Sequence, residues 1–274
     1  MAENTGSRKQ AVRAIFSRAA PTYGGIGPPF THFGRRLVEV AGLQLGWKVL
    51  DVAAGRGAVT FPAVEQVGMA GHVLGIDLAP QMVIETLADL KQRGLKNVDL
   101  REMDAEQLEL ADESFDAVLC GFGLMFFPEL GRALGEFRRV LRAGSVIAVT
   151  TWDEGDPRWT WYDELVRSYS QTDNVPPRAR QLTRPSELAG ALESAGFADV
   201  SVAMEAQDVV FPTEESWWSS LWSHGMRGAL DRMPPPVLSD FKDAAFAKMQ
   251  PQRESDGFHE VWQALIGTGR RPQR

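Results

Sequence analysis

Val49-Leu50-Asp51-Val52-Ala53-Ala54-Gly55-Arg56-Gly57 is a short apolar run that passes into a turn containing two glycines. A helical pattern of apolar residues follows over 59–67. Glycine lets the backbone turn sharply and approach a ligand closely, and the free N–H groups at the start of a helix favour electronegative groups. The stretch therefore predicts a buried strand, a tight turn and a helix at which a nucleotide cofactor binds. By itself, Gly-x-Gly is also typical of an ordinary strand-to-helix turn.

Strands and helices alternate on either side of this turn. Apolar runs predict strands over 48–53, 72–76, 98–102, 115–120 and 146–151. Helical spacing predicts helices over 59–67, 79–93, 106–110 and 129–141. Each crossover between parallel strands places a helix on a face of the sheet, and strands buried on both faces are continuously apolar. Residues 46–152 are thus expected to form an α/β core with a mostly parallel sheet.

Two flanking regions complete the chain. Residues 1–45 are expected to form a helical lid, with one helix stopped by Pro21, a flexible connector over 24–29 and a second helix opening at Thr31. A transit peptide is the alternative interpretation of the start. Residues 153–274 predict helices over 159–169 and 185–195, strands over 200–211 and 258–266, and between these strands a helical pair over 213–233 and 236–249. This insertion, about 213–251, is expected to bind substrate.

Composition narrows the function classes. The 274 residues can bury a full core, and a net charge of −7 argues against general nucleic-acid binding. No apolar run approaches the roughly 18 residues of a membrane span, so no membrane association and a cytoplasmic location are expected. Cys120 is the one cysteine, which excludes an intramolecular disulfide, and we expect it to be buried. No His, Asp or Glu set has metal-site spacing, so no metal is expected.

Two further carboxylates follow strand ends. Asp77 closes the second strand, where it can accept hydrogen bonds from both ribose hydroxyls of a nucleotide. Asp104 follows the third strand, where it can accept one from an adenine amine or cap a turn. A nicotinamide oxidoreductase shares the glycines and Asp77, but its fingerprint has Gly or Ala where this chain has Thr60. That class is disfavoured and remains an alternative.

The motifs together resemble a known family. They are Val49–Gly57, Gly75-Ile76-Asp77-Leu78-Ala79-Pro80-Gln81-Met82, Met103-Asp104-Ala105, Ser114-Phe115-Asp116-Ala117-Val118 and Arg138-Arg139-Val140-Leu141-Arg142-Ala143-Gly144. In this order and spacing they are similar to the class I S-adenosylmethionine-dependent methyltransferases, in the ubiquinone/menaquinone-type and natural-product small-molecule branch. The resemblance implies a Rossmann-like, seven-stranded, mostly parallel sheet with an antiparallel last strand. It also implies S-adenosyl-L-methionine as cofactor and S-adenosyl-L-homocysteine as product.

The resemblance also implies which residues bind the cofactor. They are Tyr23, Asp51, Ala53, Gly55, Gly57, Asp77, Leu78, Met82, Asp104, Ala105, Cys120, Gly121 and Phe122. Tyr23 matches an aromatic residue that closes over the cofactor in many relatives, although an ordinary packing role is the alternative. Two departures from the family pattern occur. Ala53 replaces the first glycine of the loop, which crowds the turn, and Ala143-Gly144-Ser145 replaces a common Pro-Gly-Gly.

Methyl transfer from a sulfonium needs few catalytic groups, because alignment of the acceptor atom, the methyl carbon and the sulfur supplies much of the rate acceleration. A general base is needed only where the acceptor must lose a proton. The catalytic candidates are Tyr23, His32 and His224, and His259, Asp153 and Glu154 are further base candidates by position. For each histidine alone, a structural or solvent-facing place is the simpler expectation.

Aromatic residues crowd the C-terminal region. The expected substrate-binding residues are Trp152, Trp159, Phe211, Trp217, Trp218 and Trp222. Packing of one helical stripe against the sheet explains part of this set, and the rest would line an apolar pocket or contact another subunit.

The predicted function is methyl transfer to an apolar small molecule, a prenylated, aromatic or polyketide-like secondary metabolite. The alternative is an S-adenosylmethionine-binding protein with another role, such as a cyclase. The N-terminal helix is expected to allow a homo-oligomer by exchange between copies.

Overall fold

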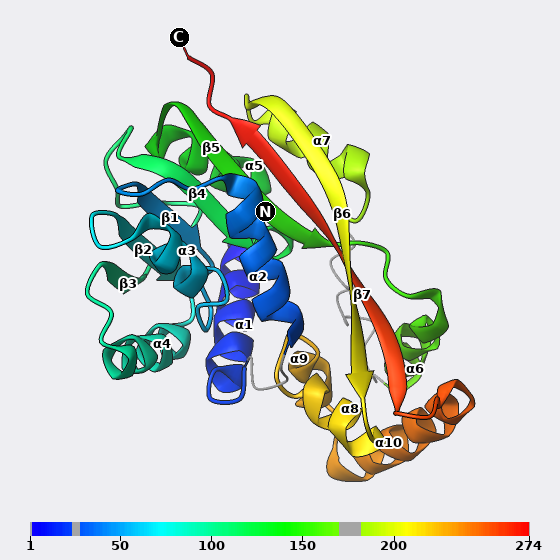
Figure 1. The fold of residues 1–274 in the computed structure, drawn as a ribbon. Helices are drawn as coiled ribbons and strands as arrows, with labels where there is room; N and C mark the ends of the chain where they lie inside the picture. The colour runs from blue at the N-terminus through cyan, green and yellow to red at the C-terminus, as the bar shows by residue number, and fades with distance from the viewer. Residues whose placement is uncertain (1, 24–27, 170–181, 274) are drawn as a thin grey trace.

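The computed structural model describes residues 2–23, 28–169 and 182–273. Its centre is a seven-stranded sheet in the order β3-β2-β1-β4-β5-β7-β6 (Figure 1). β1 to β5 are parallel, β7 is antiparallel to β5, and β6 is antiparallel to β7. This confirms the predicted sheet with its antiparallel last strand. The strands are β1 (Lys48–Val52), β2 (His72–Asp77), β3 (Val98–Glu102), β4 (Phe115–Gly121), β5 (Leu141–Trp152), β6 (Ala198–Phe211) and β7 (Phe258–Arg270).

Two hydrophobic cores sandwich the parallel strands. Two consecutive residues of β1, Val49 and Leu50, are fully buried on opposite faces of the sheet. One face carries α2 (Pro28–Ala41), α3 (Thr60–Val67) and α4 (Pro80–Arg93). The other carries α5 (Leu130–Val140) and α7 (Pro185–Ser194). The continuous apolar strands of the sequence are explained by this double burial.

The insertion lies at the far end of the long β6–β7 ribbon, beside α6 (Trp161–Tyr169) (Figure 1). It contains α8 (Glu214–Leu221), α9 (Arg227–Leu230) and α10 (Pro235–Met249). A helical insertion between the last two strands is therefore confirmed. Short 3-10 turns, η1 (Leu124–Phe126), η2 (Pro157–Trp159) and η3 (Gln250–Gln252), join other elements.

Two predicted helices are wrong in detail. Residues 106–110 form no helix, because Arg139 donates to the carbonyl oxygens of Leu108 and Leu110 and so holds this segment open. The single helix expected over 213–233 is divided into α8 and α9. Ser220 and Ser223 donate side-chain hydrogen bonds to backbone carbonyls near the break, which compete with helical pairing.

The N-terminal helix α1 (Ala2–Ala19) ends before Pro21, as predicted, and contacts α4 and α9. α2 begins at Pro28 rather than Thr31, since proline suits the first turn of a helix. The expected connector falls partly on residues 24–27, outside the described residues. Within the described parts of the chain, no helix is both long and apolar enough to span a bilayer.

Candidate cofactor-binding site

The glycine turn joins the ends of β1 and β2. The amide of Gly55 donates to Oδ2 of Asp77 over 2.8 Å, so the loop after β1 is fixed by the carboxylate that ends β2. Gly57 has a φ of +82°, and a Cβ there would lie 2.6 Å from the Phe61 ring. The turn therefore requires glycine at position 57 for both conformation and space.

Two residues that are not glycine also adopt a positive φ at the site. Ala53 has a φ of 56° and Phe122 a φ of 57°. Both line the pocket described below. Side chains with a Cβ are disfavoured in this region, and such strain gathers at ligand sites. Ala53 thus crowds the turn in the way its replacement of glycine predicts.

Asp51 lies beneath the loop and is fully buried. The Thr60 hydroxyl donates to its Oδ2 over 2.6 Å, while its Oδ1 has no hydrogen-bond partner among the described residues. Burial raises the pKa of Asp51 to about 7; the Thr60 bond opposes the shift and the nearby charge of Asp77 adds to it. Thr60, which distinguishes this chain from dinucleotide enzymes, is therefore the partner of Asp51.

Asp77 is held by backbone donors on both oxygens. Its Oδ1 accepts from the Ala79 amide over 2.8 Å, and its Oδ2 accepts from Gly55. Burial raises the pKa of Asp77, and these amide hydrogen bonds oppose the shift. Because an ionised carboxylate has about four lone-pair positions, each oxygen can still accept a further hydrogen bond from a ligand.

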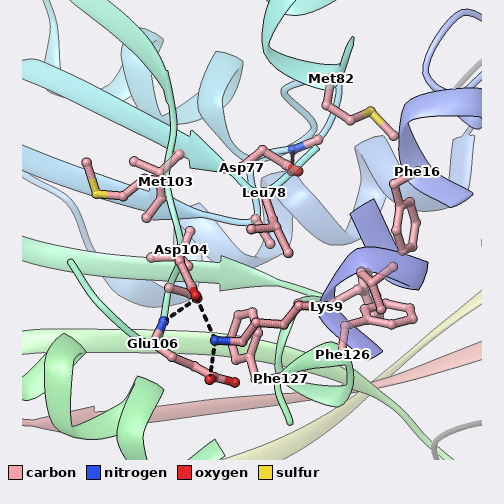
Figure 2. Close-up of a pocket in the computed structure, with 18 of the residues that line it drawn as sticks. Lys9, Phe16, Asp77, Leu78, Met82, Met103, Asp104, Glu106, Phe126 and Phe127 are labelled. Atoms are coloured by element: carbon pink, nitrogen blue, oxygen red, sulfur yellow. Dashed lines mark hydrogen bonds and ion pairs between the residues drawn. The ribbon is translucent and has the colours of Figure 1, made fainter. Parts of the chain in front are cut away.

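Asp104 and Glu106 form an acidic pair in the segment after β3. Asp104 Oδ1 accepts from the Glu106 amide over 2.9 Å. The Lys9 ammonium, from α1, lies 2.7 Å from Asp104 Oδ2 and 2.5 Å from Glu106 Oε2 (Figure 2). A segment far away in the sequence thus reaches the carboxylate predicted to recognise adenine.

These groups line one pocket over the carboxyl ends of β1, β2 and β4, with an empty volume of about 710 Å³ including its open mouth. Figure 2 shows Asp77, Leu78 and Met82 on one side and Asp104 on another. Ten of the predicted cofactor-binding residues line it: Tyr23, Ala53, Gly55, Asp77, Leu78, Met82, Asp104, Ala105, Gly121 and Phe122. Asp51, Gly57 and Cys120 are not in the lining, and Cys120 is buried as expected.

One wall of the pocket is aromatic. Phe16 of α1 meets Phe126 edge to face, with ring centroids 4.9 Å apart, and both line the pocket. Tyr23 lies 6.0 Å from Phe16. Behind them, Trp152 stacks on Phe122 at 3.8 Å. Of the predicted substrate residues, Trp152 is the one in contact with a pocket-lining ring.

The other predicted substrate residues lie elsewhere. Trp159, Phe211, Trp217, Trp218 and Trp222 belong to a third hydrophobic core between α6, the insertion and the ends of β6 and β7. Trp217 is 2% exposed and stacks on Trp159 at 5.7 Å. Their part in substrate binding stays a prediction, and the packing of this core accounts for their number.

Of the base candidates, only Tyr23 lines the pocket. His32 faces Glu205 of β6 at 3.4 Å, and His259 lies between Asp208 and Asp256. His224 accepts from the Met226 amide through Nδ1, which leaves the proton of a neutral ring on Nε2. Asp153 and Glu154 are also outside the lining.

The sequence analysis missed part of the pocket wall. One face of α1 contributes Lys9, Val12 and Phe16. Val12 and Phe16 follow Lys9 by three and seven residues, and this helical spacing was a usable signal. The other missed residues lie on strands or directly after them. Val52 and Ile76 belong to β1 and β2, and the remaining ones follow β3 or β4: Met103, Glu106, Gly123, Phe126, Phe127 and Pro128. The aromatic run after β4 was a usable signal for Phe126 and Phe127.

Comparison with known proteins gives matches over the same region. The model of a methyltransferase domain family matches residues 49–144. Nocamycin O-methyltransferase of Saccharothrix syringae is 32% identical over 228 residues, which cover 78% of this chain and 81% of that protein. Aklanonic acid methyltransferase of Streptomyces sp. (strain C5) is 40% identical over 146 residues, which cover 53% of this chain and 66% of that protein.

A quinone enzyme and a solved structure agree with these matches. Demethylmenaquinone methyltransferase of Listeria welshimeri is 26% identical, over 72% of this chain and 91% of that protein. A methyltransferase structure from Bacillus halodurans C-125 superposes with a TM-score of 0.60, covering 87% of this chain and 98% of that one at 23% identity. The structural likeness supports the fold.

Proposed function

Because this chain belongs to the S-adenosylmethionine-dependent methyltransferases, we propose that it methylates an apolar small molecule of secondary metabolism, of prenylated, aromatic or polyketide-like type. The observation that carries the proposal is the pocket itself, which has acidic groups at the strand ends and aromatic rings on another wall. The relatives named for aklanonic acid and nocamycin support the acceptor class.

The acidic half of the pocket fits the cofactor. S-Adenosylmethionine is a cationic sulfonium with a ribose and an adenine, and when bound it supplies an activated methyl group. Asp77 has lone pairs left for the ribose hydroxyls, and Asp104 offers an acceptor to the adenine amine. Asp51 lies beneath the loop, and its buried Oδ1 has no hydrogen-bond partner among the described residues, so it can accept a hydrogen bond from a ligand or loop amide. Residues that favour a cation therefore surround the pocket on this side.

The aromatic half suits the acceptor. Phe16, Phe126 and Tyr23 present ring faces and edges that pack against a planar apolar molecule, and such pockets need few polar groups to fix orientation. Burial, together with the negative charge of Asp77, raises the pKa of Tyr23 well above its usual value. We therefore assign its hydroxyl the role of a hydrogen-bond donor that orients an acceptor oxygen, rather than that of a base.

The remaining expectations about setting stay predictions. A net charge of −7 disfavours nucleic acid as a partner, and we expect a cytoplasmic enzyme. α1 packs on its own chain here, so a homo-oligomer formed by exchange of this helix would repeat the same contacts between copies. A monomeric mass by light scattering would contradict that association.

Incubation with methyl-labelled cofactor and a panel of acceptors tests the proposed function. The panel contains aromatic polyketide acids, naphthoquinols and prenylated phenols, with amino acids and phosphorylated amines as polar controls. We expect label in one apolar class, with one S-adenosylhomocysteine released per methyl group. Label confined to the polar controls would show that the acceptor class is wrong.

A further inference from the structure

The helix α1 carries three cations that pair with acids of neighbouring segments, and two of these acids, Asp104 and Glu106, line the pocket. Lys9 pairs with Asp104 and Glu106. Further along the helix, Arg13 lies 2.5 Å from Glu102, and Arg18 lies 2.9 Å from Asp231 beside α9. α1 is thus bound across the pocket by charge as well as by apolar contact.

Lys9 differs from the other cations in its depth. Its side chain is 22% exposed, and Glu106, which it meets, is 2% exposed. The second oxygen of Glu106 accepts from the Glu129 amide, so Lys9 is the cation that neutralises this buried carboxylate among the described residues. Partial burial lowers the pKa of Lys9, but the hydrogen bonds to Asp104 and Glu106 raise it overall, and the ammonium stays charged.

The two ends of α1 are held differently. Beyond its C-terminal end, Arg56 of the glycine turn donates to the carbonyl of Ala20 over 2.6 Å and pairs with Asp89 of α4. Ile15 packs so closely on α9 that a Cβ at Gly228 would lie 2.7 Å from it. Toward the N-terminal end, Arg13 forms an exposed ion pair, and exposed ion pairs contribute little stability. Lys9 makes the deepest ion pair between α1 and the rest of the chain among the described residues.

We propose that Lys9 is the latch of the helical lid expected over residues 1–45, and that opening of this latch controls the exchange of S-adenosylmethionine and S-adenosylhomocysteine. The inference rests on the proposed function for the identity of the ligand. Lys9 crosses to Asp104, the predicted adenine partner, and Phe16 of the same helix lies on the pocket wall (Figure 2). Val12, on the same face of α1, also lines the pocket. A ligand beneath α1 leaves when these contacts are broken.

The variant Lys9→Met removes the charge and keeps an apolar stem of similar length. Arg8→Met, on the exposed neighbour of Lys9, is the control because it changes the net charge of α1 equally. Lys9→Arg keeps the charge and is expected to restore the latch. For each protein, hydrogen exchange of the α1 amides is measured without ligand, and stopped-flow binding gives the association and dissociation rates of S-adenosylhomocysteine.

For Lys9→Met we expect faster hydrogen exchange of the α1 amides. The association and dissociation rates of S-adenosylhomocysteine should each rise about fivefold or more, because loss of an ion pair of this kind changes an equilibrium constant by about fivefold. The Kd should change less. Raising sodium chloride from about 50 to about 500 mM screens the exposed Arg13–Glu102 pair more than the part-buried Lys9–Glu106 pair. It should therefore accelerate the wild type, Arg8→Met and Lys9→Met by a similar small factor and leave Lys9→Met the fastest. Lys9→Arg should resemble the wild type.

Other outcomes overturn the latch in distinguishable ways. A rise in the dissociation rate alone would make Lys9 a direct ligand, and a tighter Kd would make it a competitor of adenine. Unchanged α1 exchange in Lys9→Met would show that Lys9 does not hold the helix. If no protein binds S-adenosylhomocysteine, the proposed function fails, while the exchange data still report on the latch.

Discussion

At the scale of single residues, Asp51 links the cofactor loop to stability. Its pKa is raised to about 7 in the folded protein, from an ordinary value near 3.8. The folded state therefore holds this proton more tightly than the unfolded chain. Stability from this group is full at low pH and is lost as pH rises through about 7. The cause is the cost of an ionised carboxylate that is buried and has one oxygen without a hydrogen-bond partner among the described residues.

The variant Asp51→Asn tests this linkage. The amide keeps an acceptor for the Thr60 hydroxyl but does not titrate. We expect the wild type to lose melting temperature between pH 5 and pH 8, and Asp51→Asn to lose less. Asp240→Asn, at an exposed carboxylate of α10, is the matched control. An equal loss in Asp51→Asn and the wild type would show that the carboxyl of Asp51 does not bind this proton.

Most of the residues expected from the sequence to bind the cofactor line the pocket, because the ends of the strands converge on one edge of the sheet. Asp77 and Asp104 each follow a strand, and both reach the pocket. Lys9 was not predicted, since it reaches Asp104 across 95 positions of chain and a lone surface lysine has no motif. Contacts between distant segments depend on packing angles that local patterns do not contain.

At the scale of elements, the tryptophans of α8 belong to a core. Trp217 is 2% exposed against Trp159 and Tyr162, whereas Phe126 after β4 is half-buried at the pocket. Trp217→Ala should reduce the free energy of unfolding by about 3–5 kcal/mol, the usual cost of truncating a buried aromatic residue. In the folded protein it should leave the KM for the acceptor nearly unchanged.

Phe126→Ala provides the comparison. It should raise the KM for the acceptor and destabilise the protein less, because part of its surface is already open. Denaturant unfolding and steady-state kinetics on both variants measure the difference. The reverse pattern, with a raised KM in Trp217→Ala alone, would show that the tryptophans of α8 contribute to the substrate site.

Helices in the core were predicted well, and those outside it less well. α4 and α5 have apolar residues at helical spacing because each buries one face on the sheet. The 106–110 segment has the same local pattern, but Arg139, a residue of α5, donates hydrogen bonds to two of its carbonyl oxygens. The break between α8 and α9 depends on serine side chains that satisfy backbone groups. In both places a side chain competes with helical hydrogen bonding.

At the scale of the whole molecule, the sheet brings the glycine turn and the ends of β2, β3 and β4 together, and α1 covers them. The reversal of strand order next to β1 places the pocket where open α/β sheets bind ligands. Alternation of strands and helices predicted this edge. The sequence predicted an aromatic pocket on the insertion, whereas the aromatic residues that line the pocket over the strand ends come from α1, Tyr23 and the segment around the end of β4. The density of tryptophan by itself does not distinguish a core from a pocket.

Calorimetric titration with S-adenosylhomocysteine tests the central claim most directly. The wild type and the control Asp240→Asn should bind one equivalent per chain. Asp77→Asn places an amide donor against the Gly55 or Ala79 amide and should weaken binding by about tenfold or more, as expected when a hydrogen bond to a charged group is lost. Failure of the wild type to bind, or equal affinity in Asp77→Asn, would contradict a cofactor site at the ends of β1 and β2.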